Sequence, residues 1–220
     1  MVYAPVYLIP SWFSGFDILF QIAFAIVALL VSIYAFKVYK LSGQQASKIF
    51  GIGFLLIFIS YFLQLLLNII VLVQLNDEIC NMIQLKDVAL LYNIGVYTHL
   101  FFFILGLGVL SFISVHLEGW KARTLLLIII FTALLLSING FLMYYLLSSI
   151  LLAFLVIHYG QNYARHRRKH TLLVLIGFVF LLLGSIYFMF SSERGLFYVL
   201  GNALALVAFI LILTNLLLLR

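Results

Sequence analysis

The sequence predicts an all-α, polytopic membrane protein: a seven-transmembrane helix bundle with its N-terminus outside and its C-terminus inside. Three observations predict this fold class: the composition, the lengths of the apolar stretches and the positions of the basic residues. Of the 220 residues, 67% are hydrophobic and 8% are charged, whereas a soluble domain carries about a quarter charged residues. A chain with so little polar surface indicates a bilayer as its solvent.

Seven apolar stretches are candidates for the transmembrane spans. A spanning helix needs about 20 largely apolar residues, and charges, Gly or Asn separate the stretches from one another. The fourth stretch is the shortest and follows directly on the charged residues 118–123. In chain order, the predicted spans are Phe16–Tyr39, Ile49–Gln74, Val88–Val115, Thr124–Ser137, Phe141–Tyr163, Leu172–Phe190 and Leu196–Leu219.

The basic residues predict the orientation of these spans. Ten of the twelve Lys and Arg residues follow spans one, three, five and seven, and only Lys86 and Arg194 fall on the other side. Five of the six acids, including Asp17, fall on that other side. Because cytoplasmic loops carry the excess of Lys and Arg, the N-terminus is predicted outside. The basic run at 164–170, "ARHRRKH", then serves as a topology determinant beside an anionic leaflet rather than as a nucleic-acid site.

An internal repeat divides the predicted single domain, residues 1–220, into two units. The tripeptide "IGF" at Ile52–Phe54 recurs at Ile176–Phe178, and Tyr39 matches Tyr163 at the same spacing. In the third and seventh spans, His99 is then placed opposite Asn202. This pattern predicts a 3+1+3 parallel repeat, with a three-helix unit at 16–115, a linker helix at 124–137 and a second three-helix unit at 141–219.

Polar residues within the spans gather in the predicted outer half, and they form the candidate ligand-binding site. On the second span, spacings of three and four place them on one helical face. The inner halves are mostly Leu, Ile, Val and Phe. The candidate ligand-binding residues are Tyr61, Gln64, Asn68, Asn93, Tyr97, His99, Tyr198 and Asn202.

His99 lies in the middle of the third span, where an unpaired imidazole is costly. At 100° per residue it shares a face with Tyr92, Gly95 and Gly106, and small residues mark close helix contacts in membranes. That face is therefore predicted to point into the bundle. Two interpretations stay open: a bond from His99 to Gln64 or a tyrosine that joins helices, or a ligand contact at the floor of an outward pocket.

The sequence predicts neither an enzyme nor a cofactor or metal site. Serine-hydrolase elbows, phosphate loops and nucleotide motifs do not occur in it. The seventh span has no lysine for a retinal Schiff base, and no carboxylate is predicted deep within a span.

The predicted layout, the short basic loops, the repeat and the ending "YVLGNALALVAFILILTNLLLLR" (Tyr198–Arg220) resemble a family of seven-helix sensor modules. These modules precede signalling domains in archaeal and bacterial membrane proteins. The resemblance implies a receptor-like protein of a prokaryotic plasma membrane that binds a lipid or another small or amphipathic ligand. Such modules usually continue into a kinase or cyclase, whereas this sequence stops at Arg220. The resemblance therefore implies a separate membrane or cytoplasmic protein as signalling partner.

Two other function classes stay open on the sequence. A small transporter or channel subunit would use the same outer cavity, although the only prolines are Pro5 and Pro10 and alternating-access helices are often broken by Pro or Gly. A structural subunit of a membrane complex would use the polar residues only to join helices.

The predicted orientation can be tested by cysteine labelling from outside intact cells. We expect an impermeant thiol reagent to modify Cys80, which follows the second span, and to miss a cysteine introduced by Arg167→Cys in a Cys80→Ser background. The physical reason is the excess of basic residues on the cytoplasmic side. The reverse labelling pattern would show that the predicted orientation is wrong and that the N-terminus lies inside.

Overall fold

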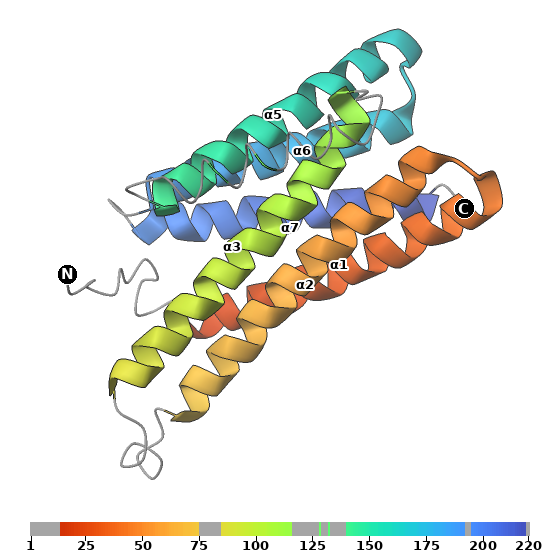
Figure 1. Cartoon of the computed structure of the whole chain (residues 1–220). Coiled ribbons are helices and arrows are strands. Elements are labelled where there is room, and N and C mark those ends of the chain that lie inside the picture. The colour runs from red at the N-terminus through yellow and green to blue at the C-terminus, as the bar shows by residue number, and fades with distance from the viewer. Residues whose placement is uncertain are drawn as a thin grey trace.

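A computed structural model describes residues 14–74, 85–115, 128, 132, 140–191 and 195–218. Every regular element in this part of the chain is an α-helix (Figure 1). The helices are α1 (Ser14–Ser42), α2 (Gln45–Gln74), α3 (Leu85–Val115), α5 (Gly140–His166), α6 (Lys169–Met189) and α7 (Gly195–Leu218). The predicted fourth span, Thr124–Ser137, lies outside the described residues except for Ile128 and Thr132, which are helical.

Several of the described basic residues lie on the helices rather than in the loops where the sequence analysis placed them. Lys37 and Lys40 belong to α1 and Lys48 to α2, so only residues 43–44 connect these two helices. The predicted spans were too short at these ends because hydropathy marks only the lipid-immersed part of a helix. The backbone hydrogen bonds continue beyond it, and a cation is favourable near a helix C-terminus.

The outer surface of the bundle is apolar along each described helix. All six helices are long and hydrophobic enough to cross a membrane. Large apolar side chains at helical spacing are exposed on these surfaces, among them Leu19, Ile26 and Ile33 on α1, and Ile150, Phe154 and Ile157 on α5. Apolar faces of this extent suit hydrocarbon and not water. The chain is therefore a multi-pass integral membrane protein.

The six helices are arranged in a ring in which each one packs against its neighbours in sequence. α2 lies between α1 and α3, α6 lies between α5 and α7, α3 contacts α5, and α7 closes the ring against α1 (Figure 1). The contacts within each set of three helices are more extensive than the two contacts between the sets. The two predicted three-helix units thus meet along two seams, α3–α5 and α1–α7.

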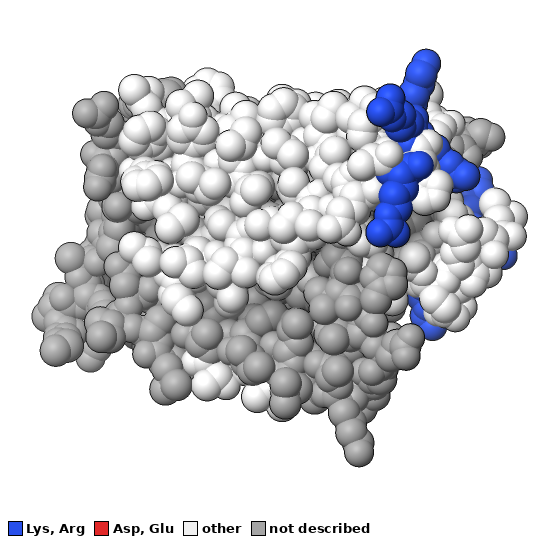
Figure 2. Space-filling view, turned by 90° about the horizontal axis from the view of Figure 1, so that it is seen from above, with Lys and Arg blue, Asp and Glu red and all other residues white. Residues whose placement is uncertain are grey.

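The two ends of the bundle differ in charge. The described Lys and Arg side chains gather at the end where α1 meets α2 and α5 meets α6 (Figure 2). The first residues of α1, α5 and α7 lie at the opposite end. The sole acidic side chain described, that of Asp17, is at this second end, on the first turn of α1. The bundle is therefore polarised along its axis.

The turns at the basic end have the same backbone geometry in both units. Gly43 follows α1 with a φ of 69°, and Arg167 follows α5 with a φ of 47°. The Gly43 N–H donates to the Tyr39 carbonyl at 2.8 Å, and the Arg167 N–H donates to the Tyr163 carbonyl at 2.7 Å. The internal repeat in the sequence aligned these same two tyrosines. The two turns therefore occupy equivalent positions in the two units.

The two "IGF" glycines also occupy equivalent places. A Cβ atom on Gly53 would lie 3.2 Å from the carbonyl oxygen of Gly106 on α3. A Cβ atom on Gly177 would lie 3.3 Å from the carbonyl oxygen of Ala208 on α7. In both units the glycine therefore lets the second helix approach the backbone of the third, which is the usual role of small residues in membrane helix packing.

The same register extends to the other end of the bundle, where the units differ. The hydroxyl of Ser60 donates to the carbonyl of His99 at 2.8 Å. A Cβ atom on Gly184 would lie 3.1 Å from the carbonyl of Gly201. In this register His99 corresponds to Gly201, one residue before the Asn202 with which the sequence comparison paired it. A hydrogen-bonded Ser–His pair in one unit is thus matched by two glycines in the other.

The close approach of α2 and α3 can be tested with Gly106→Ala. Its new Cβ atom would lie 2.8 Å from the carbonyl oxygen of Gly53, so the helices must separate. We expect a loss of about 1–3 kcal/mol in the free energy of unfolding, measured by denaturation in detergent. The control is Gly160→Ala on α5, whose Cβ atom would meet only Leu175, at 3.9 Å. Equal effects of the two substitutions would contradict the close contact.

Candidate functional site

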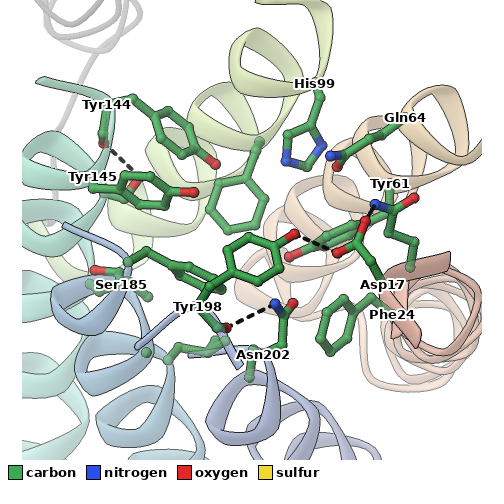
Figure 3. Close-up of a pocket in the computed structure, with 18 residues that line it drawn as sticks. Asp17, Phe24, Tyr61, Gln64, His99, Tyr144, Tyr145, Ser185, Tyr198 and Asn202 are labelled. Carbon is green, nitrogen blue, oxygen red and sulfur yellow. Dashed lines mark hydrogen bonds between the residues drawn. The ribbon is translucent and has the colours of Figure 1, made fainter. Parts of the chain in front are cut away.

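A polar pocket lies between the helices at the end opposite the basic residues (Figure 3). All six described helices contribute to its lining. Its polar lining residues are Asp17, Gln21, Tyr61, Gln64, His99, Tyr144, Tyr145, Ser148, Ser185, Tyr198 and Asn202.

The size of the pocket limits what it can hold. The space open to the centre of a water-sized probe is about 80 Å³. One water occupies roughly 10–15 Å³ on this measure, and an apolar cavity of about 150 Å³ takes up benzene. The pocket therefore accommodates several waters, or a group of a few non-hydrogen atoms. A larger molecule would have to extend through the mouth.

Four polar side chains form a hydrogen-bonded chain along one wall of the pocket. Asn68 Nδ2 on α2 donates to Gln21 Oε1 at 2.9 Å, and Gln21 Nε2 donates to Asp17 Oδ2 at 2.6 Å. The Tyr198 hydroxyl on α7 donates to the other carboxylate oxygen, Asp17 Oδ1. Asp17 has only 2% of its surface exposed. The chain thus joins α2, α1 and α7 across the α1–α7 seam.

His99 is buried, with 9% of its surface exposed, and its imidazole points toward the pocket (Figure 3). Its Nδ1 lies 2.6 Å from Ser60 Oγ, and Ser60 Oγ donates to the His99 carbonyl. Because a serine hydroxyl has one proton, Nδ1–H must donate to Ser60. In the neutral ring, Nε2 then keeps a free lone pair as a hydrogen-bond acceptor.

Aromatic rings surround the pocket in a nearly continuous series. Tyr61 contacts the ring of His99, with centroids 5.2 Å apart. The series consists of Phe24–Tyr61 (5.0 Å), Tyr61–Phe103 (5.9 Å), Phe103–Tyr144 (6.0 Å), Tyr144–Tyr145 (4.8 Å), Tyr145–Phe188 (5.3 Å) and Phe188–Tyr198 (5.5 Å). Neighbouring centroids at these distances are typical of attractive aromatic pairs. The wall is therefore built of packed rings.

Packed apolar side chains lie beyond the pocket, toward the basic end. Phe209 contacts Phe24 and Tyr61, which line the pocket, with centroids 5.4 and 6.1 Å away. On its other side Phe209 meets Phe54 at 6.2 Å. Both Phe54 and Phe209 have 1% or less of their surface exposed. They form an apolar floor that separates the pocket from the basic end of the bundle.

With this geometry established, the chain was compared with known proteins. No protein-family model, curated protein or solved structure matches it.

The structure brings together most of the residues that the sequence analysis proposed for the site. Tyr61, Gln64, His99, Tyr198 and Asn202 line the pocket. Asn68 borders it through its bond to Gln21. One proposed residue is not part of the lining: Tyr97 is 65% exposed on the outer surface of α3. The side chain of Asn93 lies outside the described residues.

The candidate set omitted six polar residues that line the pocket: Asp17, Gln21, Tyr144, Tyr145, Ser148 and Ser185. Asp17 was used only as an acid on the outer side, and Gln21 was not considered. The sequence analysis also expected Gln64 or a tyrosine, rather than Ser60, as the partner of His99. One signal was available: Asp17, Gln21 and Phe24 are spaced by four and three residues, which places them on one face of a helix. Hydropathy gives the depth of a residue but not whether it faces lipid or the interior.

The bond between Ser60 and His99 can be tested with a double-mutant cycle. We expect Ser60→Ala and His99→Leu each to lower the free energy of unfolding, by an amount on the order of 1 kcal/mol for a hydrogen bond between membrane helices. Because both changes remove the same bond, the double variant should lose less than the sum. The measurement is denaturation in detergent.

The matched control for this cycle is Thr214→Val. Its hydroxyl donates only to the Ile210 carbonyl of its own helix, on an exposed face. Combined with Ser60→Ala, it should give an additive loss. Additive losses for Ser60→Ala and His99→Leu as well would mean that the two side chains are not coupled.

Proposed function

We propose that this protein is a receptor-like membrane module that binds a small or amphipathic molecule in the pocket. The observation that carries the proposal is the pocket's construction: a polar, aromatic-lined space at one end of the bundle and a packed apolar floor beneath it. A closed floor of this kind suits capture of a ligand from one side. Binding sites with a few placed polar groups among apolar and aromatic walls are typical of small-molecule pockets.

Unused hydrogen-bonding groups support binding over a purely structural role. Among the described residues, no partner is found for the hydroxyl of Tyr61 or for the amide of Gln64, both of which line the pocket. Buried polar groups are normally paired. Groups that only joined helices would be paired with one another, as Ser60 and His99 are, whereas these groups are available to a ligand or to water.

The packing of the floor supports binding over transport. A transported molecule would have to pass Phe54 and Phe209, which are fully buried, and then the turns at the basic end. Neither α2 nor α7 contains a proline or is interrupted at this level. These two helices thus lack the breaks that often form transport sites.

For the complete bundle we propose seven helices, with the pocket open to the outside and the basic end in the cytoplasm. The basic residues support this orientation through the positive-inside rule. The two described turns at the basic end, residues 43–44 and 167–168, are short, so we propose that a signal leaves the protein through a separate membrane or cytoplasmic partner that contacts this end or the sides of the helices.

Occupancy of the pocket can be tested by native mass spectrometry of protein purified in mild detergent. Ser148 lines the pocket, and its hydroxyl donates to the Tyr144 carbonyl of its own helix at 2.9 Å. Ser148→Leu should fill the space and abolish a bound mass that the unchanged protein carries or takes up from a cell extract. The loss should be at least about tenfold in occupancy, since overlap with a ligand costs more than 1.4 kcal/mol.

The matched control is Thr214→Leu, which removes a hydroxyl bonded in the same way but on the exposed face of α7. This variant should keep the bound mass. Equal occupancy in both variants, or no uptake by the unchanged protein, would count against the binding function.

A further inference from the structure

The pocket contains a carboxyl group that no described Lys or Arg contacts. Among the described residues, Asp17 is the only acidic one that lines the pocket, and no Lys or Arg lines it. The described basic side chains gather at the other end of the bundle (Figure 2). Both groups that bond to Asp17, the Gln21 amide and the Tyr198 hydroxyl, are neutral. A buried carboxylate is unfavourable without a positive partner, so a cationic ligand would stabilise the ionised form of Asp17.

The carboxylate keeps hydrogen-bonding capacity for such a ligand. An ionised carboxylate offers about four acceptor positions. Oδ2 accepts one hydrogen bond from Gln21 and Oδ1 accepts one from Tyr198. The figure shows the carboxylate at the edge of the open space, between Tyr198 and Tyr61 (Figure 3). The remaining acceptor positions can therefore serve N–H donors of a bound molecule.

The aromatic wall completes a site for a positive charge. Rings attract cations within about 6 Å of their centroids, and the attraction grows when water is excluded. Tyr61 and Tyr198 flank the carboxylate, and Phe103, Tyr144, Tyr145 and Phe188 continue the series of rings. A carboxylate combined with several rings is the arrangement that recognises organic ammonium groups.

A metal ion fits the described site less well than an organic cation does. In the part of the chain that the structure describes, no group of three or more His, Cys, Asp or Glu side chains could hold a metal ion. Hard cations need about six oxygen ligands, and most of this wall is ring carbon.

We propose that the ligand of this pocket is a small organic cation whose ammonium group is held by Asp17 within the aromatic wall. This inference rests on the proposed binding function and specifies its ligand class. The volume of about 80 Å³ suits an ammonium group with a few carbon atoms. Such a group belongs to free amines and also to lipid headgroups, and the pocket lies near the helix ends, where headgroups are found.

The test for a free amine compares isopropylammonium with propan-2-ol, which has nearly the same shape and no charge. Binding is measured by the concentration dependence of thermal stability in detergent, with sodium chloride added to equalise ionic strength. We expect the protein to prefer isopropylammonium by about tenfold or more, as an attraction to both a carboxylate and rings implies. Asp17→Asn should abolish the preference, since it keeps the shape of the side chain and removes its charge.

Two further variants keep the test interpretable. Thr214→Val changes a residue on the exposed face of α7 without changing charge, and it should keep the preference for the cation. Tyr61→Leu leaves the carboxylate in place and removes a ring, and it should weaken binding of isopropylammonium more than binding of propan-2-ol. If Asp17→Asn does not fold, Tyr61→Leu still tests whether the pocket prefers a cation.

The test for a lipid headgroup compares nanodiscs of phosphatidylethanolamine, which carries an ammonium group, with nanodiscs of phosphatidylglycerol, which does not. If the ligand is a lipid, the unchanged protein should be more stable in the first lipid, and Asp17→Asn should remove the difference. Dependence on Asp17 in either the amine or the lipid experiment supports the proposal and identifies the source.

Equal affinity for isopropylammonium and propan-2-ol together with equal stability in the two lipids, or no dependence on Asp17 in either experiment, would overturn the cation proposal. The comparison of Ser148→Leu with Thr214→Leu then shows whether the pocket binds a molecule of another class. If those two variants still differ in bound mass, the binding function stands and only the ligand class is wrong.

Discussion

The structure around the pocket depends on the burial of one carboxyl group in a bundle whose outer surface faces hydrocarbon. Asp17 cannot turn toward lipid, because a charged or polar group there has no partner. Each of its oxygens accepts one hydrogen bond, from the Gln21 amide and the Tyr198 hydroxyl, and Gln21 is held in turn by Asn68. The position of the first helix relative to the second and the last is therefore fixed by hydrogen bonds at this end, and the wall of the pocket follows from it.

At the basic end, by contrast, the two three-helix sets have nearly the same construction. The turns after Tyr39 and Tyr163 match, and the glycines of both "IGF" segments let the helices approach closely. Toward the pocket the sets diverge, with Ser60 and His99 in one and two glycines in the other. The half of the bundle at the basic end, where the two sets are alike, forms a packed apolar support. The polar pocket lies in the other half, where the two sets differ.

The sequence predicts the coarse fold well, since hydropathy alone places the six described helices to within a few residues. It also predicts that His99 faces the interior, because Gly95 and Gly106 share its helical face. The structure confirms this prediction, since all three residues are buried. The seventh helix and the orientation stay predictions. The spacing of Asp17, Gln21 and Phe24 indicates one helical face, but the pairing of Asp17 with Tyr198, which is 181 residues away, could not be predicted. The exposure of Tyr97 was missed because the depth of a tyrosine within a span does not say whether its side chain faces lipid or the interior.

The bond between Asp17 and Tyr198 also has a consequence for biosynthesis. Its two residues are separated by 181 positions, and at about 5–20 residues per second a ribosome needs roughly 10–40 s to make the intervening chain. During that time the first helix is already synthesised while the hydroxyl partner of its carboxyl group does not yet exist. The pocket is consequently among the last parts of the bundle to assemble, and a nascent chain that lacks its last helix has no complete site.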